Sequence, residues 1–193
     1  MKKRLLAAQS GLGKTYSEQK YEEILDTDKY TLSIKYHREE YPELTDEEFK
    51  SIQKIPKEDW FNNYVQKIEE LIRESKEDIL LFWLNMDLIK YLYEKGYNVD
   101  IVIYNPECVS KEILTERFLS RGNDENFSDR IDMFDTYRKY VSAGIFHVYI
   151  LNKDIFLDDF LVATGSKLKN YNKSEQYTRE VKKYITHLLS FKT

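Results

Sequence analysis

The segment from Ala8 to Thr15, A-Q-S-G-L-G-K-T, contains the residue types best suited to binding a phosphate group. It fits the phosphate-binding pattern G-x-x-x-x-G-K-[ST] at the last three positions, whereas alanine stands at the first. In such loops the backbone N–H groups and the start of the next helix surround phosphate oxygens, and glycine lets the backbone come close to them. The residues that we expect to bind a nucleotide here are Gly11, Leu12, Gly13, Lys14, Thr15 and Tyr16.

Lys14 and Thr15 have distinct expected roles in this loop. We expect the Lys14 ammonium to reach the outer phosphates and to be catalytic, and the Thr15 hydroxyl to occupy one position on Mg²⁺. A glycine turn that precedes a lysine by coincidence is the alternative interpretation, because G-K-T alone is a weak signal. The position of the loop at the first expected strand-to-helix junction favours the phosphate-binding interpretation.

Two aspartates, Asp26 and Asp28, end the second expected strand. The simplest topology places this strand next to the first, and ligands of open α/β sheets bind at the carboxyl ends of strands. Either carboxylate could orient a metal-bound water or accept the proton of a substrate hydroxyl, and Asp26 could bind the metal with Thr15. Capping a helix or a turn is the alternative role for each aspartate. The third expected strand ends in Trp83-Leu84-Asn85, without the acidic residue that conventionally binds metal there.

Arginines form a second group of candidates. Arg117 and Arg121 are four residues apart and share one face of an expected helix, and Arg130 follows across a turn. All three could close over a bound nucleotide and stabilise a moving phosphoryl group, or they could form a solvated basic face paired with nearby acids. Arg38, together with Asp26 and Asp28, is a candidate for binding the acceptor.

Apolar runs that alternate with helical patterns predict an α/β protein with a parallel sheet, and 193 residues suffice for a single domain over residues 1–193. The expected strands are 3–8, 24–28, 79–84, 99–104 and 145–151. The expected helices are 13–23, a short one near 46 that starts at the capping box Thr45-Asp46-Glu47-Glu48, one from about 60 to 72, one capped by Asn85 that ends at Gly96, and 110–121, 126–142, 154–162 and 175–189. Residues 30–57 are charged and rich in tyrosine, and we expect them to leave the sheet and lie over the active-site face.

Composition narrows the range of functions. The net charge of −4 and the pI of about 5.6 argue against a partner that needs a broad basic surface, such as nucleic acid. No apolar run reaches the roughly 20 residues that a membrane span requires. The single cysteine, Cys108, and three scattered histidines argue against disulfides and structural zinc, which favours a cytoplasmic setting.

The glycine loop, the Asp26-Thr27-Asp28 strand end and the stretch E-R-F-L-S-R-G-N at 116–123 together carry a resemblance. Over about residues 3–160 the chain resembles small P-loop kinases, especially nucleoside-monophosphate-kinase-like proteins of bacteriophages and Gram-positive bacteria. The resemblance implies a three-layer P-loop NTPase fold with a five-stranded, mainly parallel sheet flanked by helices. It also implies that ATP with Mg²⁺ donates its γ-phosphoryl group to a (deoxy)nucleoside monophosphate or similar nucleotide.

Residue by residue, the resemblance assigns loop roles to Lys14 and Thr15 and lid roles to Arg117 and Arg121, within a lid-like segment at about 110–142. It places Asp28 near the acceptor. Two other functions stay open. One is a kinase of a modified base hydroxyl in DNA. The other is a non-catalytic nucleotide-binding sensor or phage interaction protein, suggested by the missing acidic end of the third strand.

Overall fold

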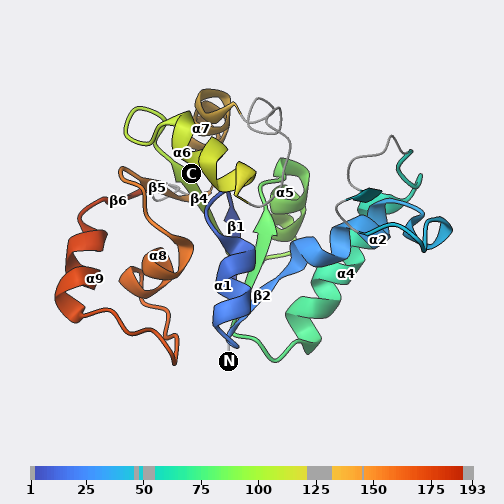
Figure 1. Ribbon diagram of the computed structural model, residues 1–193, viewed down its shortest axis with the longest axis horizontal. Coiled ribbons are helices and arrows are strands. Elements are labelled where there is room, and N and C mark those ends of the chain that lie inside the picture. Colours follow the sequence, from blue (N-terminus) through green and yellow to red (C-terminus); the bar gives the residue numbers. More distant parts are fainter. Residues whose placement is uncertain (1–2, 46–47, 50–54, 121–131, 145, 189–193) are drawn as a thin grey trace.

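The computed structural model describes residues 3–45, 48–49, 55–120, 132–144 and 146–188 of the chain. Within these residues a six-stranded sheet has the strand order β2-β3-β1-β4-β5-β6. Every neighbouring pair is parallel except β5 and β6. Figure 1 shows α8 and α9 at one side of the molecule and α2 and α4 at the other. The chain is therefore an α/β protein with a mostly parallel sheet flanked by helices.

The secondary-structure elements follow the expected alternation, with differences at their ends. The strands are β1 Arg4–Ala8, β2 Ile24–Asp26, β3 Ile79–Trp83, β4 Val99–Tyr104, β5 His147–Leu151 and β6 Ile185–Leu188. The α-helices are α1 Lys14–Lys20, α2 Thr31–Lys35, α4 Trp60–Glu74, α5 Met86–Glu94, α6 Lys111–Leu119, α7 Met133–Ser142, α8 Leu157–Ala163 and α9 Glu175–Lys182. Two short 3-10 helices, η1 Thr27–Tyr30 and η2 Arg38–Glu40, lie between β2 and α4. Among the described residues no helix is both long and apolar enough to cross a membrane.

The central strands separate two buried apolar clusters. Successive side chains of a strand point to opposite faces, so Leu6 and Ala8 of β1 belong to one cluster while Leu5 and Ala7 belong to the other. The first cluster contains residues of α6 and α8, and the second contains residues of α4 and α5. Helices thus cover both faces of the sheet, which agrees with the continuous apolar character of its central strands.

The expected neighbour of β1 is wrong. We expected the strand that ends in Asp26 to lie beside β1, but β3 lies between them and β2 pairs only with β3. The five residues of β3 are apolar and four of them are buried, so β3 is stabilised by a central position. The three residues of β2 suit the edge of the sheet. The carboxyl ends of all three strands nevertheless meet at one edge.

The expected C-terminal helix, 175–189, is also partly wrong. Helix α9 ends at Lys182, and β6 adds an antiparallel sixth strand to a sheet for which five were expected. A longer helix would leave the edge of β5 with unpaired backbone groups, whereas Ile185 and Thr186 are β-branched and suit a strand. His187 stacks on the Tyr149 ring of β5 with 4.0 Å between ring centroids, which strengthens the pairing.

Several local predictions are confirmed. The Asn85 side chain caps α5 by accepting a hydrogen bond from the Leu88 N–H at 2.9 Å. Thr45 and Glu48 form the expected reciprocal capping box, with distances of 2.8 and 3.3 Å. In the excursion between β2 and α4, η1 follows the end of β2 directly, and α2 packs against α4. The first part of the helix expected at 126–142 lies outside the described residues.

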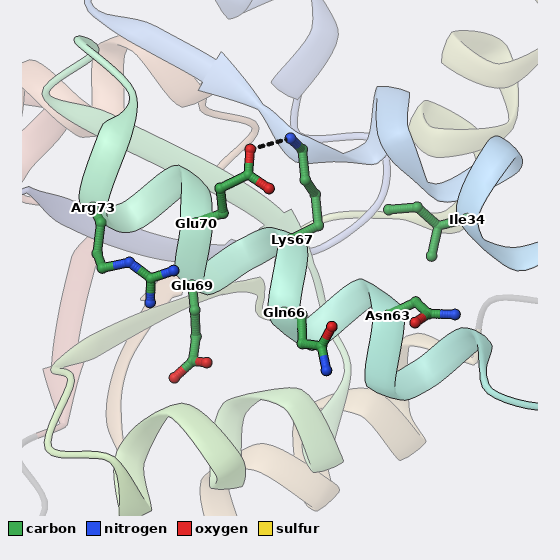
Figure 2. A pocket seen from close by; sticks show the side chains of 7 residues that line it. All are labelled: Ile34, Asn63, Gln66, Lys67, Glu69, Glu70 and Arg73. Carbon is green, nitrogen blue, oxygen red and sulfur yellow. Dashed lines mark hydrogen bonds and ion pairs between the residues drawn. The ribbon is translucent and has the colours of Figure 1, made fainter.

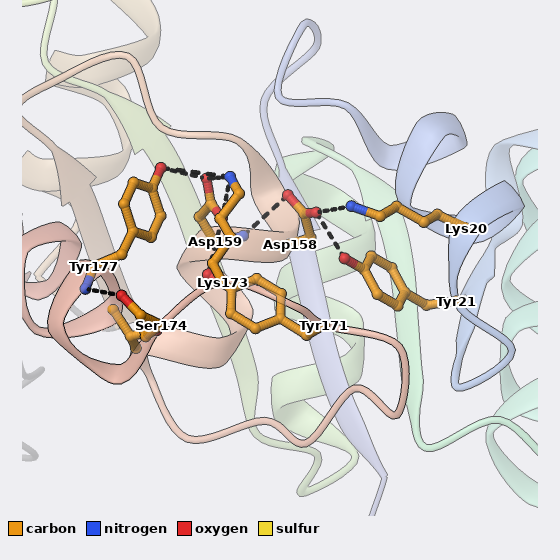
Figure 3. Close-up of polar contacts among 9 residues, drawn as sticks. Lys20, Tyr21, Asp158, Asp159, Tyr171, Lys173, Ser174 and Tyr177 are labelled. Carbon is orange, nitrogen blue, oxygen red and sulfur yellow. Dashed lines mark hydrogen bonds and ion pairs between the residues drawn. The ribbon is translucent and has the colours of Figure 1, made fainter.

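Two adjacent buried aspartates of α8 join this helix to distant parts of the chain (Figure 3). Asp158 accepts hydrogen bonds from Lys20 at 3.1 Å and from the Tyr21 hydroxyl at 2.9 Å, at the end of α1. Asp159 faces the C-terminal segment. Its three donors are the Tyr171 hydroxyl at 2.9 Å, the Lys173 ammonium at 2.8 Å and the Tyr177 hydroxyl at 3.0 Å. Helix α8 therefore ties α1 to α9.

Replacement of Asp159 by alanine should loosen α9. The substitution leaves two hydroxyls and one ammonium without their acceptor, so we expect the free energy of unfolding to fall by about 1–3 kcal/mol. Urea denaturation measures this change, and hydrogen exchange of α9 amides locates it. Arg179→Ala, on the exposed surface of the same helix, is the matched control and should change neither quantity appreciably. Equal protection of α9 in the two variants would contradict the proposed tie.

Candidate phosphate-binding site

The loop between β1 and α1 directs its carbonyl groups toward other parts of the protein. The Leu12 carbonyl accepts a hydrogen bond from the Leu157 N–H at the start of α8, at 3.1 Å, and the Gly11 carbonyl accepts one from Arg117 at 2.9 Å. The Gln9 N–H donates to Val102 of β4 at 3.0 Å. Hydrogen bonds with α8, α6 and β4 therefore fix the position of the loop.

The N–H groups of the same loop are available. Within the described part of the chain no backbone carbonyl accepts a hydrogen bond from the N–H groups of Gly11, Gly13, Lys14, Thr15 and Tyr16. Consecutive unpaired N–H groups at the start of a helix attract anions. These N–H groups could therefore bind an anion, and phosphate binding by the loop stays a prediction.

Glycine is required at two places in the loop for different reasons. Gly11 and Gly13 have φ angles of +90° and +93°, which L-amino acids with side chains rarely adopt. A Cβ on Gly11 would also lie 2.6 Å from Leu114 Cδ2, whereas a Cβ on Gly13 would lie 3.7 Å from Phe156 Cδ1, an ordinary contact distance. Glycine is therefore required at position 11 by the positive φ angle and by close packing against Leu114. At position 13 only the positive φ angle requires it.

Alanine fits the first position of the pattern because Ala8 belongs to β1. It pairs with Trp83 of β3 and Val102 of β4, and its methyl group is buried in the core. Its φ angle is not positive. No glycine is needed at a position of ordinary strand geometry, so the departure from the pattern leaves the loop intact.

Lys14 lies at the centre of the site. Its side chain is 8% exposed, and its Nζ atom lies 3.2 Å from the Ala8 carbonyl oxygen and 3.3 Å from Asp28 Oδ2. A buried ammonium needs such partners because burial disfavours the charged form. The loop thus holds one cation beside its free N–H groups.

Asp28 reaches this position through η1. One carboxylate oxygen contacts Lys14, and the other accepts a hydrogen bond from the Trp83 N–H, at 3.2 Å. Asp28 therefore lies against the end of β3, where the sequence lacks the conventional acidic residue. Its side chain is 36% exposed, so solvent or a ligand can reach it.

Asp26 and Thr15 form the second polar pair of the site. The Thr15 hydroxyl donates to Asp26 Oδ2 at 3.1 Å, and Asp26 Oδ1 accepts from the Asp28 N–H, also at 3.1 Å. Burial raises the pKa of Asp26 to about 6, with the negative charge of Asp28 acting in the same direction, while Lys14 opposes the shift. The backbone N–H of Asp26 donates to Glu18.

The Thr15 hydroxyl and the Asp26 carboxylate suit a hard cation. The described residues contain no group of three His, Cys, Asp or Glu side chains arranged to hold a metal ion. Mg²⁺ commonly has few protein ligands and completes its coordination with water and phosphate oxygens. Thr15 and Asp26 could therefore supply two ligands to such a cation, and the expected Mg²⁺ stays a prediction.

Arg117 lies beside the loop, but the protein itself engages its guanidinium. Besides Gly11, it donates to the Tyr104 hydroxyl at 2.6 Å and forms an ion pair with Asp154. Its Cζ atom lies 4.4 Å from the centre of the Phe156 ring. These contacts make Arg117 a support of the loop, and its expected catalytic role stays a prediction.

The other predicted site residues make different contacts or fall outside the described residues. Arg121 and Arg130 fall in the segment 121–131, which is not among the described residues. The Arg38 guanidinium donates to the carbonyls of Tyr41 and Leu44, and its expected acceptor role stays a prediction. Tyr16 is 49% exposed and its ring centroid lies 6.3 Å from that of Phe156.

Sequence reasoning missed several supporting residues. Tyr104, Asp154 and Leu157 contact the loop or Arg117 from other elements of the fold, and no spacing in the sequence indicates this. Glu18 is one turn beyond Lys14 in α1, so its helical spacing could have placed it near the site.

A groove on the surface of α4 is separate from the site (Figure 2). Its lining residues are Ile34, Asn63, Gln66, Lys67, Glu69, Glu70 and Arg73, none of which belongs to the loop or to the acidic pair. Lys67 and Glu70 form an ion pair across one turn of α4, at 2.6 Å. The groove is therefore not part of the candidate phosphate-binding site.

Comparisons with known proteins add little. The chain matches no protein-family model, and it matches no curated protein. A solved structure of the tunicamycin resistance protein of Deinococcus radiodurans is similar to 86% of this chain and 96% of its own, with 11% sequence identity and a TM-score of 0.46. At that level the similarity carries no conclusion about this chain. The fold and the site thus define the chain as an α/β protein with a glycine loop at its first strand-to-helix junction.

Gly11→Ala should damage the loop more than its conformational strain alone explains. Gly96 supplies the matched control, because its φ angle is +83° and a Cβ added to it would meet nothing within 4 Å. Each alanine should cost about 1–2 kcal/mol in backbone strain. Only Gly11→Ala must also displace the buried Leu114, so we expect it to lower the free energy of unfolding more than Gly96→Ala does, and to weaken ATP binding in calorimetry because it lies in the loop. Equal losses of stability in the two variants, measured by urea denaturation, would contradict the importance of this close approach.

The raised pKa of Asp26 predicts a pH-dependent stability. Because its pKa of about 6 in the folded protein exceeds the ordinary 3.8, the folded chain binds more protons than the unfolded chain between these values. Stability should therefore fall as pH rises from about 4 to about 6 and stay lower above that window. Asp26→Asn should flatten this part of the curve and stabilise the protein at neutral pH. Urea unfolding across the window tests this, and identical pH profiles for wild type and variant would refute it.

Proposed function

We propose that the chain is an ATP-dependent phosphotransferase that uses Mg²⁺. The observation that carries the proposal is the position of Lys14, a nearly buried cation held beside free loop N–H groups and next to a carboxylate, Asp28. Phosphoryl transfer depends on positive charge and hydrogen-bond donors placed around a moving phosphoryl group. The loop and Lys14 provide both.

Each residue of the site has a separate role in this proposal. The loop N–H groups bind the phosphate oxygens, and Lys14 neutralises charge on the outer phosphates. Thr15 and Asp26 hold Mg²⁺, which when bound neutralises phosphate charge and orients the transferred group. Arg117 keeps the Gly11 carbonyl turned away from the bound phosphates.

The acidic residues weaken the main reason for considering a non-catalytic protein. That alternative rested on the missing carboxylate after β3. In the folded chain, Asp28 occupies the end of β3 by accepting the Trp83 N–H, and Asp26 contacts Thr15. Carboxylates that follow β2 thus contact the end of β3 and the loop threonine, which supports a metal site without an acid of β3 itself.

The acceptor proposed from the sequence is a (deoxy)nucleoside monophosphate or a similar nucleotide, bound near Asp28 beside the excursion at residues 30–57. ADP formation from ATP, measured with a panel of nucleosides and nucleotides, tests it. No stimulation by any member would count against a nucleotide acceptor. Stimulation by DNA with hydroxylated bases would favour the polymer kinase instead.

Lys14→Met should abolish most of the activity while roughly preserving side-chain volume. Because Lys14 would stabilise charge that develops in the transition state, we expect turnover to fall by about 10²–10³-fold or more. The measurement is ADP formation under saturating ATP, with ATP affinity from calorimetry. Lys90→Met, on the exposed side of α5, is the control and should retain activity. Wild-type turnover in Lys14→Met would rule out a phosphate loop in this role.

A further inference from the structure

The charges around Asp28 indicate which chemical group of the acceptor receives the phosphoryl group. Resting on the proposed function, we propose that the acceptor presents a hydroxyl group to Asp28, which takes its proton, so that the product is a phosphate ester. A nucleotide can still be the acceptor, but it would react through a sugar or base hydroxyl instead of its phosphate.

The geometry holds Asp28 in place on the open side of Lys14. Its Oδ1 atom accepts the Trp83 N–H at 3.2 Å, its Oδ2 atom lies 3.3 Å from Lys14 Nζ, and its own N–H donates to Asp26 at 3.1 Å. The residue is therefore fixed by contacts from three segments, yet more than a third of its side chain is exposed. A fixed and accessible carboxylate next to the phosphate-binding lysine can meet an acceptor there.

The local charge balance disfavours a phosphate as the reacting group. Asp26 and Asp28 lie close together, because the Asp28 N–H donates to Asp26, and Lys14 is the cation that forms an ion pair with Asp28 among the described residues. Two further cations among the described residues are already paired: Lys29 with Glu18 at 2.6 Å, and Arg117 with Asp154. An acceptor phosphate would bring further negative charge beside these carboxylates and the donor phosphates. A hydroxyl is neutral and meets no such repulsion.

A hydroxyl acceptor also needs what Asp28 provides. An alcohol is a weak nucleophile until it loses its proton, whereas a phosphate is already ionised at neutral pH. In the proposed step the acceptor O–H bond breaks and its proton passes to the Asp28 carboxylate. The acceptor oxygen bonds to the γ-phosphorus as the bond from that phosphorus to the bridging oxygen breaks, and ADP leaves. Asp28 then returns the proton to solvent.

The competing role for Asp28 is to hold Lys14 by charge alone. In that case, loss of the carboxylate would disturb ATP binding and transfer to every acceptor alike. Proton transfer to Asp28 predicts instead that ATP affinity is largely kept while transfer to hydroxyl groups is lost. The two roles therefore differ in how a variant divides its effect between binding and transfer.

The experiment compares wild type, Asp28→Asn and Asp78→Asn with ATP and Mg²⁺. Asp78 is an exposed aspartate just before β3, at the opposite edge of the sheet, and supplies the same chemical change away from the site. The acceptors are nucleosides, their 5′-monophosphates, and glycerol at molar concentration, with water as the nucleophile present throughout. Phosphorus NMR distinguishes phosphate esters from the anhydrides of nucleoside diphosphates.

We expect esters as the products, from nucleosides, from nucleotide hydroxyls or at least from glycerol. Asp28→Asn should lower ester formation by about 10²–10⁴-fold, with ATP affinity within about threefold of wild type, and Asp78→Asn should match wild type. Nucleoside diphosphates as the sole transfer product would overturn the hydroxyl proposal and leave the phosphotransferase proposal standing. If Asp28→Asn formed esters or hydrolysed ATP as fast as wild type, the proposed role of Asp28 would be overturned. Absence of any transfer, to water included, would overturn the proposed function itself.

Discussion

A lysine ammonium withdrawn from water at the end of a sheet needs an anion beside it, and this need organises the rest of the site. Asp28 supplies that anion from η1, across the end of β3. The contact joins the loop that follows β1 to the segment that follows β2, two strands away in the sheet. This ion pair brings Lys14 together with Asp26 and Asp28, which come from a different segment of the chain.

Other elements bind the carbonyl groups of the glycine loop, whereas several of its N–H groups have no backbone acceptor among the described residues. Leu157 of α8 and Arg117 of α6 bind loop carbonyls, and Asp158 of α8 binds Lys20 at the far end of α1. Helix α8 thus forms hydrogen bonds with both the glycine loop and α1, the helix that follows it. Because these partners use the carbonyl oxygens, the N–H groups are left for an anion. Asp159 extends the same connection to α9, which links the C-terminal segment to the site through one helix.

Asp26 shows that the site is arranged at some cost to stability. A buried carboxylate next to a second carboxylate is disfavoured in its charged form, which is why its pKa is raised. Thr15 and Lys14 offset only part of that cost. Under the proposed function, a divalent cation supplies the positive charge that the two carboxylates lack, which is consistent with a site for such a cation.

The sequence by itself determined the local parts of this protein. The pattern around Lys14 identified the loop, and periodicity located strands such as Val99–Tyr104 and the Asn85 cap, because these depend on neighbours along the chain. Only the tertiary structure decided that β3 lies between β1 and β2, that residues after α9 form a strand, and that Arg117 is engaged with Asp154. Those outcomes depend on which edges need hydrogen bonds and which charges need partners across many residues, and no local pattern records that competition.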